Sequence, residues 1–214
     1  MTLTVAIPIF PRLTALDGIG PYEVLQRNPE LDIVFVGHEI GPVRTENGML
    51  GLVADHRFED VPSPDLIVFP GGIGTRALVD DARVLDWLRT AHATSRWTTS
   101  VCTGSLVLAA AGLLDGLTAT THWGARDALS KLGAVPVPER VVEHPAERII
   151  TAAGVSSGID MALRLTELLF DETAAQAAQL MIEYDPQPPF DMGALERSTD
   201  EVMERVLAYA AERE

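Results

Sequence analysis

The sequence is poor in cysteine, aromatic residues and basic residues. Its single cysteine cannot form an intramolecular disulfide, so nothing points to an oxidising compartment. The chain has 16 Lys and Arg against 31 Asp and Glu, and a formal net charge of −15 repels phosphate backbones and anionic membranes. It has no apolar run of about 20 residues to cross a bilayer, and Met1–Val5 lacks the features of a secretory signal. We therefore expect a cytoplasmic protein with no nucleic-acid or membrane partner.

The remaining composition favours one folded α/β domain. The chain has 214 residues, 47% of them hydrophobic, which suits a single sizeable core. Short apolar runs of strand length alternate with helical patterns, and this alternation predicts a parallel sheet covered on both faces. The predicted strands of the first half are Leu3–Ile9, Ile33–Val36, Leu66–Phe69 and Trp97–Val101, and helices are predicted at Tyr22–Arg27 and Val84–Ala93.

The second half continues this pattern. A strand pair is predicted at Val141–Val142 and Ile149–Thr151, and helices are predicted at Ala125–Leu132, Ser156–Phe170, Thr173–Tyr184 and Thr199–Glu212. The proline-rich segment Pro186–Pro189 breaks the chain before the last helix. We assign residues 1–190 to the α/β domain and residues 191–214 to a C-terminal helical extension of that domain.

Cys102 has the most informative setting in the chain. The predicted strand Trp97–Val101 runs directly into Cys102-Thr103-Gly104, and a predicted helix over Ser105–Ala111 follows. Such a strand–turn–helix elbow presents its side chain at the end of the sheet, facing the N–H groups that open the helix, which predicts a depressed thiol pKa. The alternative is a buried, unreactive cysteine; the elbow favours a nucleophile.

Two more loops are predicted at the same carboxyl edge of the sheet, where ligands of open α/β sheets bind. In the first, Asp17 either caps a helix or turn or carries a proton for Cys102, with burial raising its pKa. In the second, Gly71-Gly72 either forms a tight turn or brings the Gly72 N–H, with that of Thr103, close to a ligand. The apolar side chains Ile19 and Ile73 are predicted to line a small apolar pocket.

The histidines and glycines give little support to a metal or nucleotide. His122, followed by Trp123, is either the base for Cys102 or a hydrogen-bonded supporting residue. The other histidines lack ligand spacing with acids or cysteine, so no metal site is expected. Gly71-Gly72-Ile73-Gly74 has neither the spacing nor the partner acid of a dinucleotide site, and no Walker lysine is present.

Taken together, four motifs resemble the ThiJ/PfpI superfamily, which is related to class I glutamine amidotransferase domains. They are Asp17-Gly18-Ile19-Gly20-Pro21, Pro70-Gly71-Gly72, Ser100–Ser105 and Ala119-Thr120-Thr121-His122-Trp123. Within the superfamily the chain is most similar to the isocyanide hydratases, from about residue 3 to Phe190 and including Ala153–Asp160. The resemblance implies a flavodoxin-like, doubly wound, mostly parallel sheet with a cysteine elbow.

The resemblance also implies roles. Cys102 matches the nucleophile, Asp17 its partner carboxylate and Thr103 the residue beside the sulfur. An isocyanide hydratase adds water to R–N≡C and gives an N-substituted formamide, here through a Cys102 thioimidate, without cofactor or metal. The implied substrate is small and uncharged, and the implied assembly is a homodimer. Peptidase-like members place His after the cysteine, where this chain has Thr103.

Two other functions stay open from the sequence. One is a glyoxalase or deglycase-like enzyme on small carbonyls, although Glu is usual in such members at the position of Asp17. The other is a redox-sensing protein without enzymatic activity, in which Cys102 is oxidised. Transcription regulators that share the domain carry an added DNA-binding region, for which we expect no room before Glu214.

Overall fold

The computed structural model describes residues 2–211, which form two compact units. The first unit extends to Ile182 and contains the sheet; the second begins at Glu183. Within the described residues the main sheet has seven strands in the order β10-β11-β7-β6-β1-β2-β5. These strands are β1 (Leu3–Pro8), β2 (Leu31–Gly37), β5 (His56–Arg57), β6 (Leu66–Phe69), β7 (Trp97–Val101), β10 (Val141–His144) and β11 (Ile149–Ala152).

The sheet is parallel except for one of its two edge strands, β10. Strands β1, β6, β7 and β11 pair in parallel, whereas β10 runs antiparallel to β11. All four residues of β6 are buried, as expected for a central strand covered on both faces. This confirms the predicted doubly wound, mostly parallel sheet and the positions of the strands in the first half of the chain. It also confirms the predicted strand pair, which is β10 and β11.

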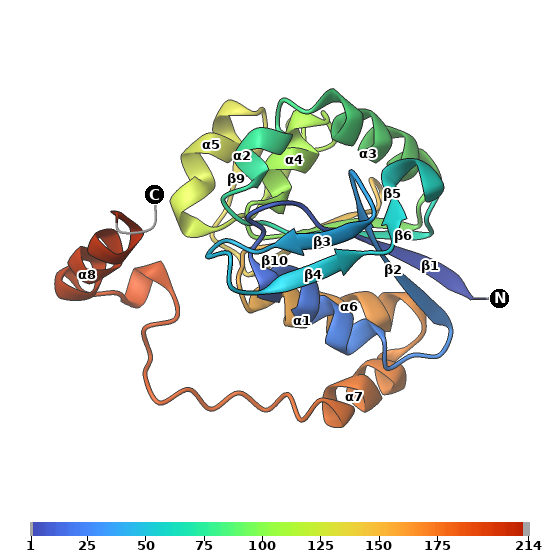
Figure 1. The fold of residues 1–214 in the computed structure, drawn as a ribbon. Helices are drawn as coiled ribbons and strands as arrows, with labels where there is room; N and C mark the ends of the chain where they lie inside the picture. The colour runs from blue at the N-terminus through green and yellow to red at the C-terminus, as the bar shows by residue number, and fades with distance from the viewer. Residues whose placement is uncertain (1, 212–214) are drawn as a thin grey trace. The chain divides into compact units, whose positions relative to one another are not determined.

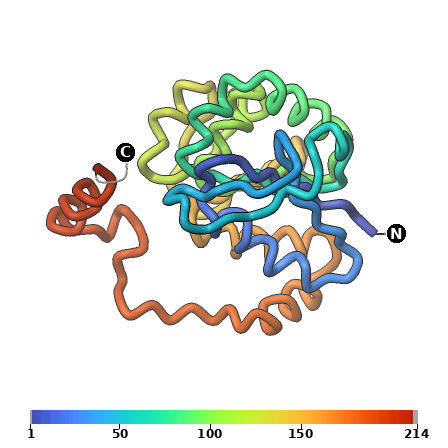
Figure 2. Tube along the Cα trace, viewed as in Figure 1, coloured from blue at the N-terminus to red at the C-terminus, as the bar shows by residue number. Residues whose placement is uncertain are grey.

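Helices cover both faces of the sheet (Figure 1). One face carries α2 (Thr75–Leu78), α3 (Ala82–Thr94), α4 (Gly104–Ala110) and α5 (Arg126–Lys131), and the other carries α1 (Ala15–Leu25), α6 (Ser157–Leu169) and α7 (Glu172–Met181). The chain trace in Figure 2 can be followed from one face to the other as colour changes along the sequence. Two hydrophobic cores result, one on each side of the sheet.

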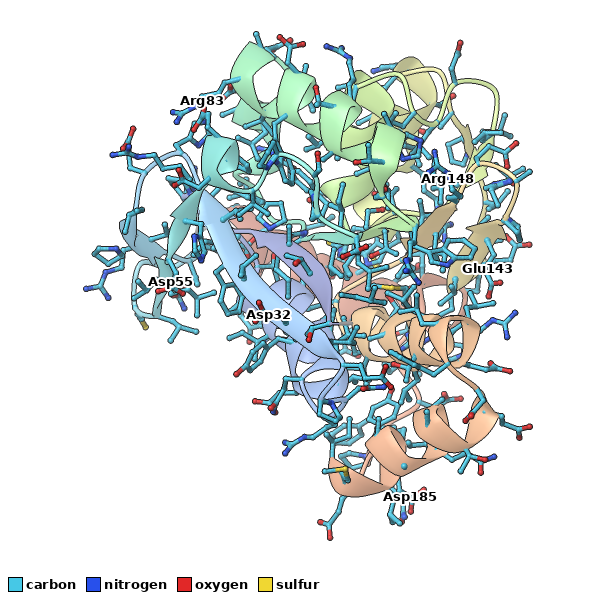
Figure 3. The ribbon with its side chains drawn as sticks, turned by 90° about the vertical axis from the view of Figure 1, so that its right-hand side faces the viewer. Asp32, Asp55, Arg83, Glu143, Arg148 and Asp185 are labelled. Atoms are coloured by element: carbon cyan, nitrogen blue, oxygen red, sulfur yellow. The ribbon has the colours of Figure 1, made fainter. Side chains whose placement is uncertain are left out.

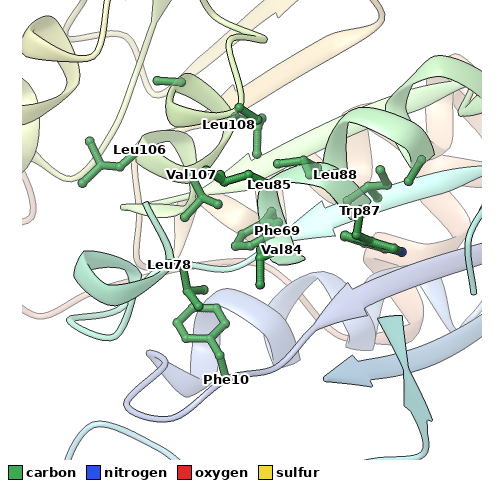
Figure 4. Close-up of a cluster of buried hydrophobic side chains, with 14 of the residues drawn as sticks. Phe10, Phe69, Leu78, Val84, Leu85, Trp87, Leu88, Leu106, Val107 and Leu108 are labelled. Atoms are coloured by element: carbon green, nitrogen blue, oxygen red, sulfur yellow. The ribbon is translucent and has the colours of Figure 1, made fainter. Parts of the chain in front are cut away.

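The first core lies between the sheet and helices α3 and α4. Figure 4 shows Phe69 of the central strand among Val84 and Leu88 of α3 and Leu108 of α4. Phe10 packs against Phe69, with ring centroids 6.1 Å apart. Phe10 lies in the loop that follows β1, so this core fixes the chain just before the helix that carries Asp17.

An ion pair connects helix α6 to the edge strand β10 of the sheet. Glu143, labelled in Figure 3, lies on the edge strand β10. Its carboxylate accepts hydrogen bonds from Arg164 of α6, the shorter one 2.8 Å long. These hydrogen bonds therefore hold the antiparallel edge strand β10 against helix α6.

Helix α1 differs from its predicted position, and this changes the setting of Asp17. The helix begins at Ala15 and not at Tyr22, so Asp17 lies in its first turn and not in a loop. Gly20 and Pro21 disfavour a helix by local propensity. Here they let α1 approach α6 closely: a Cβ on Gly20 would lie 3.1 Å from Ile159, and one on Gly158 would lie 3.2 Å from Pro21. Packing outweighs propensity at this position.

A hairpin outside the main sheet was not predicted. Strands β3 (Gly41–Arg44) and β4 (Gly51–Ala54) pair antiparallel. The smaller elements are β8 (Thr118–Ala119), which pairs with β9 (Val135–Pro136), and the 3-10 turns η1 (Phe58–Asp60), η2 (Trp123–Ala125) and η3 (Leu195–Arg197).

The second unit contains α8 (Asp200–Ala211), which agrees with the helix predicted from Thr199, whose last residue lies outside the described residues. In residues 2–211 no helix combines the length and apolarity needed to cross a membrane.

Candidate active site

The predicted strand–turn–helix elbow at Cys102 is confirmed. β7 ends at Val101, and Cys102 adopts φ +57°, a left-handed conformation that non-glycine residues seldom take. Its N–H donates to Ala152 O at 2.9 Å, and its carbonyl accepts from the hydroxyls of Ser105 and Thr121 at 3.1 and 3.0 Å. Backbone strain of this kind persists where surrounding contacts over-determine it, which is common at functional sites.

Asp17 lies beside this elbow in a fully buried position. Its Oδ2 accepts a hydrogen bond of 3.0 Å from the Gly71 N–H, whereas Oδ1 has no regular hydrogen bond within the described residues. Burial raises the pKa of Asp17 from 3.8 to about 7, although hydrogen bonds with the Gly71 N–H and the Cys102 thiol lower it in part. The carboxyl and thiol therefore form an interacting pair in which Asp17 gains and loses its proton near neutral pH.

The depressed thiol pKa predicted from the elbow is wrong. Burial raises the pKa of Cys102 well above its usual range, the charge of Asp17 raises it further, and the Thr103 N–H lowers it only in part. The Cys102 residue is 4% exposed. A Cβ on Gly154 would lie 3.0 Å from the sulfur, which shows how closely the segment before α6 covers it. The loss of hydration raises the pKa of the thiol more than the N–H groups that open α4 lower it.

Three consecutive amides of the loop after β6 serve three different side chains. The Gly71 N–H donates to Asp17, the Gly72 N–H donates to Thr103 Oγ1 at 2.8 Å, and the Ile73 N–H donates to Glu46 Oε1 at 3.1 Å. Thr103 Oγ1 in turn donates to the Gly72 carbonyl at 3.0 Å. The loop thus links the carboxyl group, the elbow and the β3–β4 hairpin.

Gly72 has a packing role that the sequence did not predict. Its N–H is directed at the Thr103 hydroxyl and not at the sulfur. Its φ of +129° favours glycine, and a Cβ there would lie 2.4 Å from Thr14 N and 2.7 Å from Arg12 O. The space beside Gly72 is filled by the loop after β1, so a side chain at this position would disrupt the fold.

The two isoleucines lie on different elements, Ile19 on α1 and Ile73 in the loop after β6. Ile19 lies two residues after Asp17 on α1, and residues two apart on a helix do not share a face. Ile73 helps to line a cavity of about 690 Å³ between the loop after β1, β3 and α2. The lining of that cavity includes His38 and Asp81, which form a hydrogen bond of 2.7 Å, but neither Cys102 nor Asp17.

His122 and Trp123 follow β8, and their rings contact each other with centroids 5.0 Å apart and planes tilted by 36°. His122 Nδ1 accepts from the Gly124 N–H at 3.2 Å, so a neutral ring carries its proton on Nε2. Burial lowers the pKa of His122, and the charge of Glu46 raises it in part. The preceding residue, Thr121, bonds the Cys102 carbonyl, which joins this segment to the elbow.

Sequence reasoning gave no role to two residues that the structure brings to the site. Gly154 packs against Cys102 with φ +111°, and Glu46 reaches the glycine loop from the hairpin tip. Gly154 lies within Ala153–Asp160, a segment that resembles the isocyanide hydratases, but Glu46 carries no local signal. In residues 2–211 no group of three or more His, Cys, Asp or Glu side chains is arranged to hold a metal ion.

The fold and this site place the chain among flavodoxin-like α/β proteins with a cysteine elbow. The family model of the DJ-1/PfpI family matches residues 3–168, and the chain belongs to that family. It is 43% identical to an isonitrile hydratase of Pseudomonas putida over 211 residues, which cover 99% of this chain and 91% of the relative. The predicted resemblance to the superfamily is confirmed.

A solved structure and a second relative extend the comparison. The crystal structure of a THiJ/PfpI family protein from Pseudomonas syringae matches with a TM-score of 0.92 at 37% identity, covering 99% of this chain and 87% of that one. The HTH-type transcriptional regulator CdhR of Pseudomonas aeruginosa is also 37% identical, but the match covers 58% of this chain and 37% of the regulator. The likeness to the regulator is therefore confined to part of each protein.

Proposed function

We propose that this protein hydrates isocyanides to N-substituted formamides. The observation that carries the proposal is 43% identity to an isonitrile hydratase over nearly the full length of both chains. The pairing of the Cys102 thiol with a buried Asp17, whose pKa is raised to about 7, supports it, because isocyanide hydration needs a nucleophile and a proton at the same carbon.

The proposed reaction has two steps that balance without a cofactor. In the first, the Cys102 sulfur attacks the terminal carbon of R–N≡C and the thiol proton reaches that carbon through Asp17, giving the thioimidate R–N=CH–S–Cys102. In the second, water adds to the same carbon, the C–S bond breaks, and the thiol is restored as R–NH–CHO leaves. Asp17 moves a proton in both steps, and its raised pKa near 7 suits that task.

Thr103 acts in this scheme through position and through its backbone. Its N–H faces the sulfur and stabilises negative charge there. Its hydroxyl exchanges two hydrogen bonds with Gly72, which hold the glycine loop against the elbow. We propose that His122 supports the site with a neutral ring, since burial lowers its pKa, and that Trp123 adds apolar surface.

We further propose a small uncharged substrate and a homodimeric assembly. The close cover over Cys102 leaves little space for a large group. Large apolar side chains are exposed on the β3–β4 hairpin, among them Met49 (82%) and Val53 (53%), and a second copy of the chain would shield them. Light scattering at micromolar concentration tests the assembly, and the mass of a single chain would overturn it.

Turnover of a panel of alkyl and aryl isocyanides by the wild type and Cys102→Ala tests the function. We expect formamide production by the wild type and none by the variant, with a matching circular dichroism spectrum because the substitution shortens one side chain. Turnover of methylglyoxal but not of isocyanides would favour the glyoxalase alternative. Oxidation of Cys102 by peroxide, with no turnover of either substrate, would favour the redox sensor.

A further inference from the structure

The tip of the β3–β4 hairpin rests on the chain that leads into helix α1. The Glu46 N–H donates to Leu13 O at 3.1 Å, and the Arg12 N–H donates to Arg44 O at 2.9 Å. Within the tip, Thr45 bonds Leu50 O through its N–H at 3.0 Å and its hydroxyl at 3.2 Å. These contacts hold Glu46 against Leu13, which lies four residues before Asp17, although Glu46 and Asp17 are far apart in sequence.

The Glu46 carboxylate is directed at the glycine loop. Its Oε1 accepts from the Ile73 N–H, the next amide after the one that bonds Thr103. The residue is exposed, whereas Cys102 and Asp17 are buried. The loop whose Gly71 N–H bonds Asp17 therefore also holds an exposed carboxylate, with one oxygen fixed two residues further on.

The negative charge of Glu46 is not neutralised by a neighbouring cation. No Lys or Arg in residues 2–211 forms an ion pair with it, and the adjacent Arg44 turns its guanidinium to Met49 O at 3.3 Å. The charge of Glu46 raises the pKa of Asp17, Cys102 and His122 alike. The carboxylate thus acts electrostatically on all three groups of the candidate site.

We propose that Glu46 is a specificity residue that excludes anionic molecules from Cys102 and admits neutral or cationic ones. A fixed, unpaired carboxylate repels an approaching anion, and the repulsion is moderate because solvent screens it. This inference deepens the proposed function, since it names the charge class of substrate at the same site. It is tested by a reaction that does not depend on isocyanide turnover.

The single cysteine makes alkylation a direct probe of this site. Iodoacetamide and iodoacetate react with the same thiolate but differ in charge, so the ratio of their rate constants cancels changes in thiol pKa. The intact protein, Glu46→Gln and a control, Glu30→Gln, are compared, each ratio normalised to that of a small free thiol. Glu30 is exposed near the start of β2, at the opposite edge of the sheet. Gln at position 46 can still accept from the Ile73 N–H.

We expect Glu46→Gln to raise the iodoacetate-to-iodoacetamide ratio about 3- to 10-fold at low ionic strength. High salt should move the wild-type ratio toward that of the variant, and Glu30→Gln should leave it unchanged. An unchanged ratio in Glu46→Gln, an equal change in Glu30→Gln, or failure of both reagents to reach Cys102 would overturn the inference. The predicted change without isocyanide turnover would overturn the proposed function and leave this inference standing.

Discussion

The N–H of Gly71 and the carboxyl of Asp17 form a one-sided contact: Oδ2 accepts a 3.0 Å hydrogen bond, while Oδ1 is buried without a regular hydrogen bond from the described residues. One N–H donor does not replace the water that a carboxylate loses on burial, so the protonated form is favoured to about pH 7. This arrangement has consequences for both stability and activity.

We expect Asp17→Asn to be more stable than the wild type at neutral and higher pH. The pKa of Asp17 is about 7 in the folded protein and 3.8 when unperturbed, so the unfolded chain releases this proton first. The stability contributed by the protonated form is complete below the unfolded pKa and is lost as the pH rises through the folded one. The neutral amide avoids this loss, and its advantage should grow by roughly 2 to 3 kcal/mol between about pH 5 and pH 8.

Urea unfolding of both proteins at the two pH values measures this difference. Glu30→Gln, which removes an exposed carboxyl at the opposite edge of the sheet, serves as the control and should show no such trend. Lower stability of Asp17→Asn than of the wild type at pH 8 would contradict the expectation.

Isocyanide turnover should depend on the shared proton of the Asp17–Cys102 pair. The proposed reaction needs one proton on the pair, a state that forms as the pH rises through about 7 and is lost only when the thiol pKa, which is raised well above its usual value, is reached. We therefore expect kcat/KM to rise through pH 7. Asp17→Asn should lose this rise and roughly 10²-fold or more of the rate. A wild-type rate that falls through pH 7 would refute the assignment.

We expect Gly154→Ala to impair the site far more than Gly112→Ala. Both glycines have positive φ, at +111° and +83°, so each substitution brings similar backbone strain. At Gly154 the new Cβ would lie 2.6 Å from Cys102 Cβ and 3.0 Å from the sulfur, whereas nothing lies within 4 Å at Gly112. The alkylation rate of Cys102 should change in Gly154→Ala alone; equal changes in both variants would point to backbone strain and not to contact.

Thr103→Val should loosen the glycine loop, whereas Thr103→Ser should retain it. Valine keeps the shape of threonine but cannot form the two hydrogen bonds with Gly72. The Gly72 N–H then loses the hydroxyl that accepts its hydrogen bond. The expected cost is about 1 to 3 kcal/mol in the free energy of unfolding, with a fall in turnover that exceeds that of the serine variant. Identical thermal melting and turnover of the two variants would show that the hydroxyl is dispensable.

The strands and the elbow were predictable because their signals are local. Leu66–Phe69 and Trp97–Val101 are short runs bounded by turn residues, and the structure reproduces both limits. The start of α1 was not predictable from Gly18, Gly20 and Pro21, because its helical state depends on packing against α6. The predicted direction of the Cys102 pKa shift was also wrong. The burial that raises this pKa comes in part from Gly154, which is distant from Cys102 in the sequence.

The placement of Glu46 could not be read from its neighbours either. The hairpin that carries it has mostly half-buried or exposed residues, which give a weak strand pattern. Its role depends on a bond to Ile73, and that bond forms only when the hairpin folds onto the loop after β1.

The three consecutive amides at Gly71, Gly72 and Ile73 also limit how the gene can change in length. A codon inserted or deleted between Pro70 and Gly74 would shift the amides out of register with Asp17, Thr103 and Glu46 simultaneously. By contrast, the hairpin tip at Asn47–Gly48 is exposed, and a Cβ on Gly48 would meet nothing within 4 Å. Natural length variants should therefore gather at the hairpin tip and spare the loop, a pattern set by the spacing of three N–H groups.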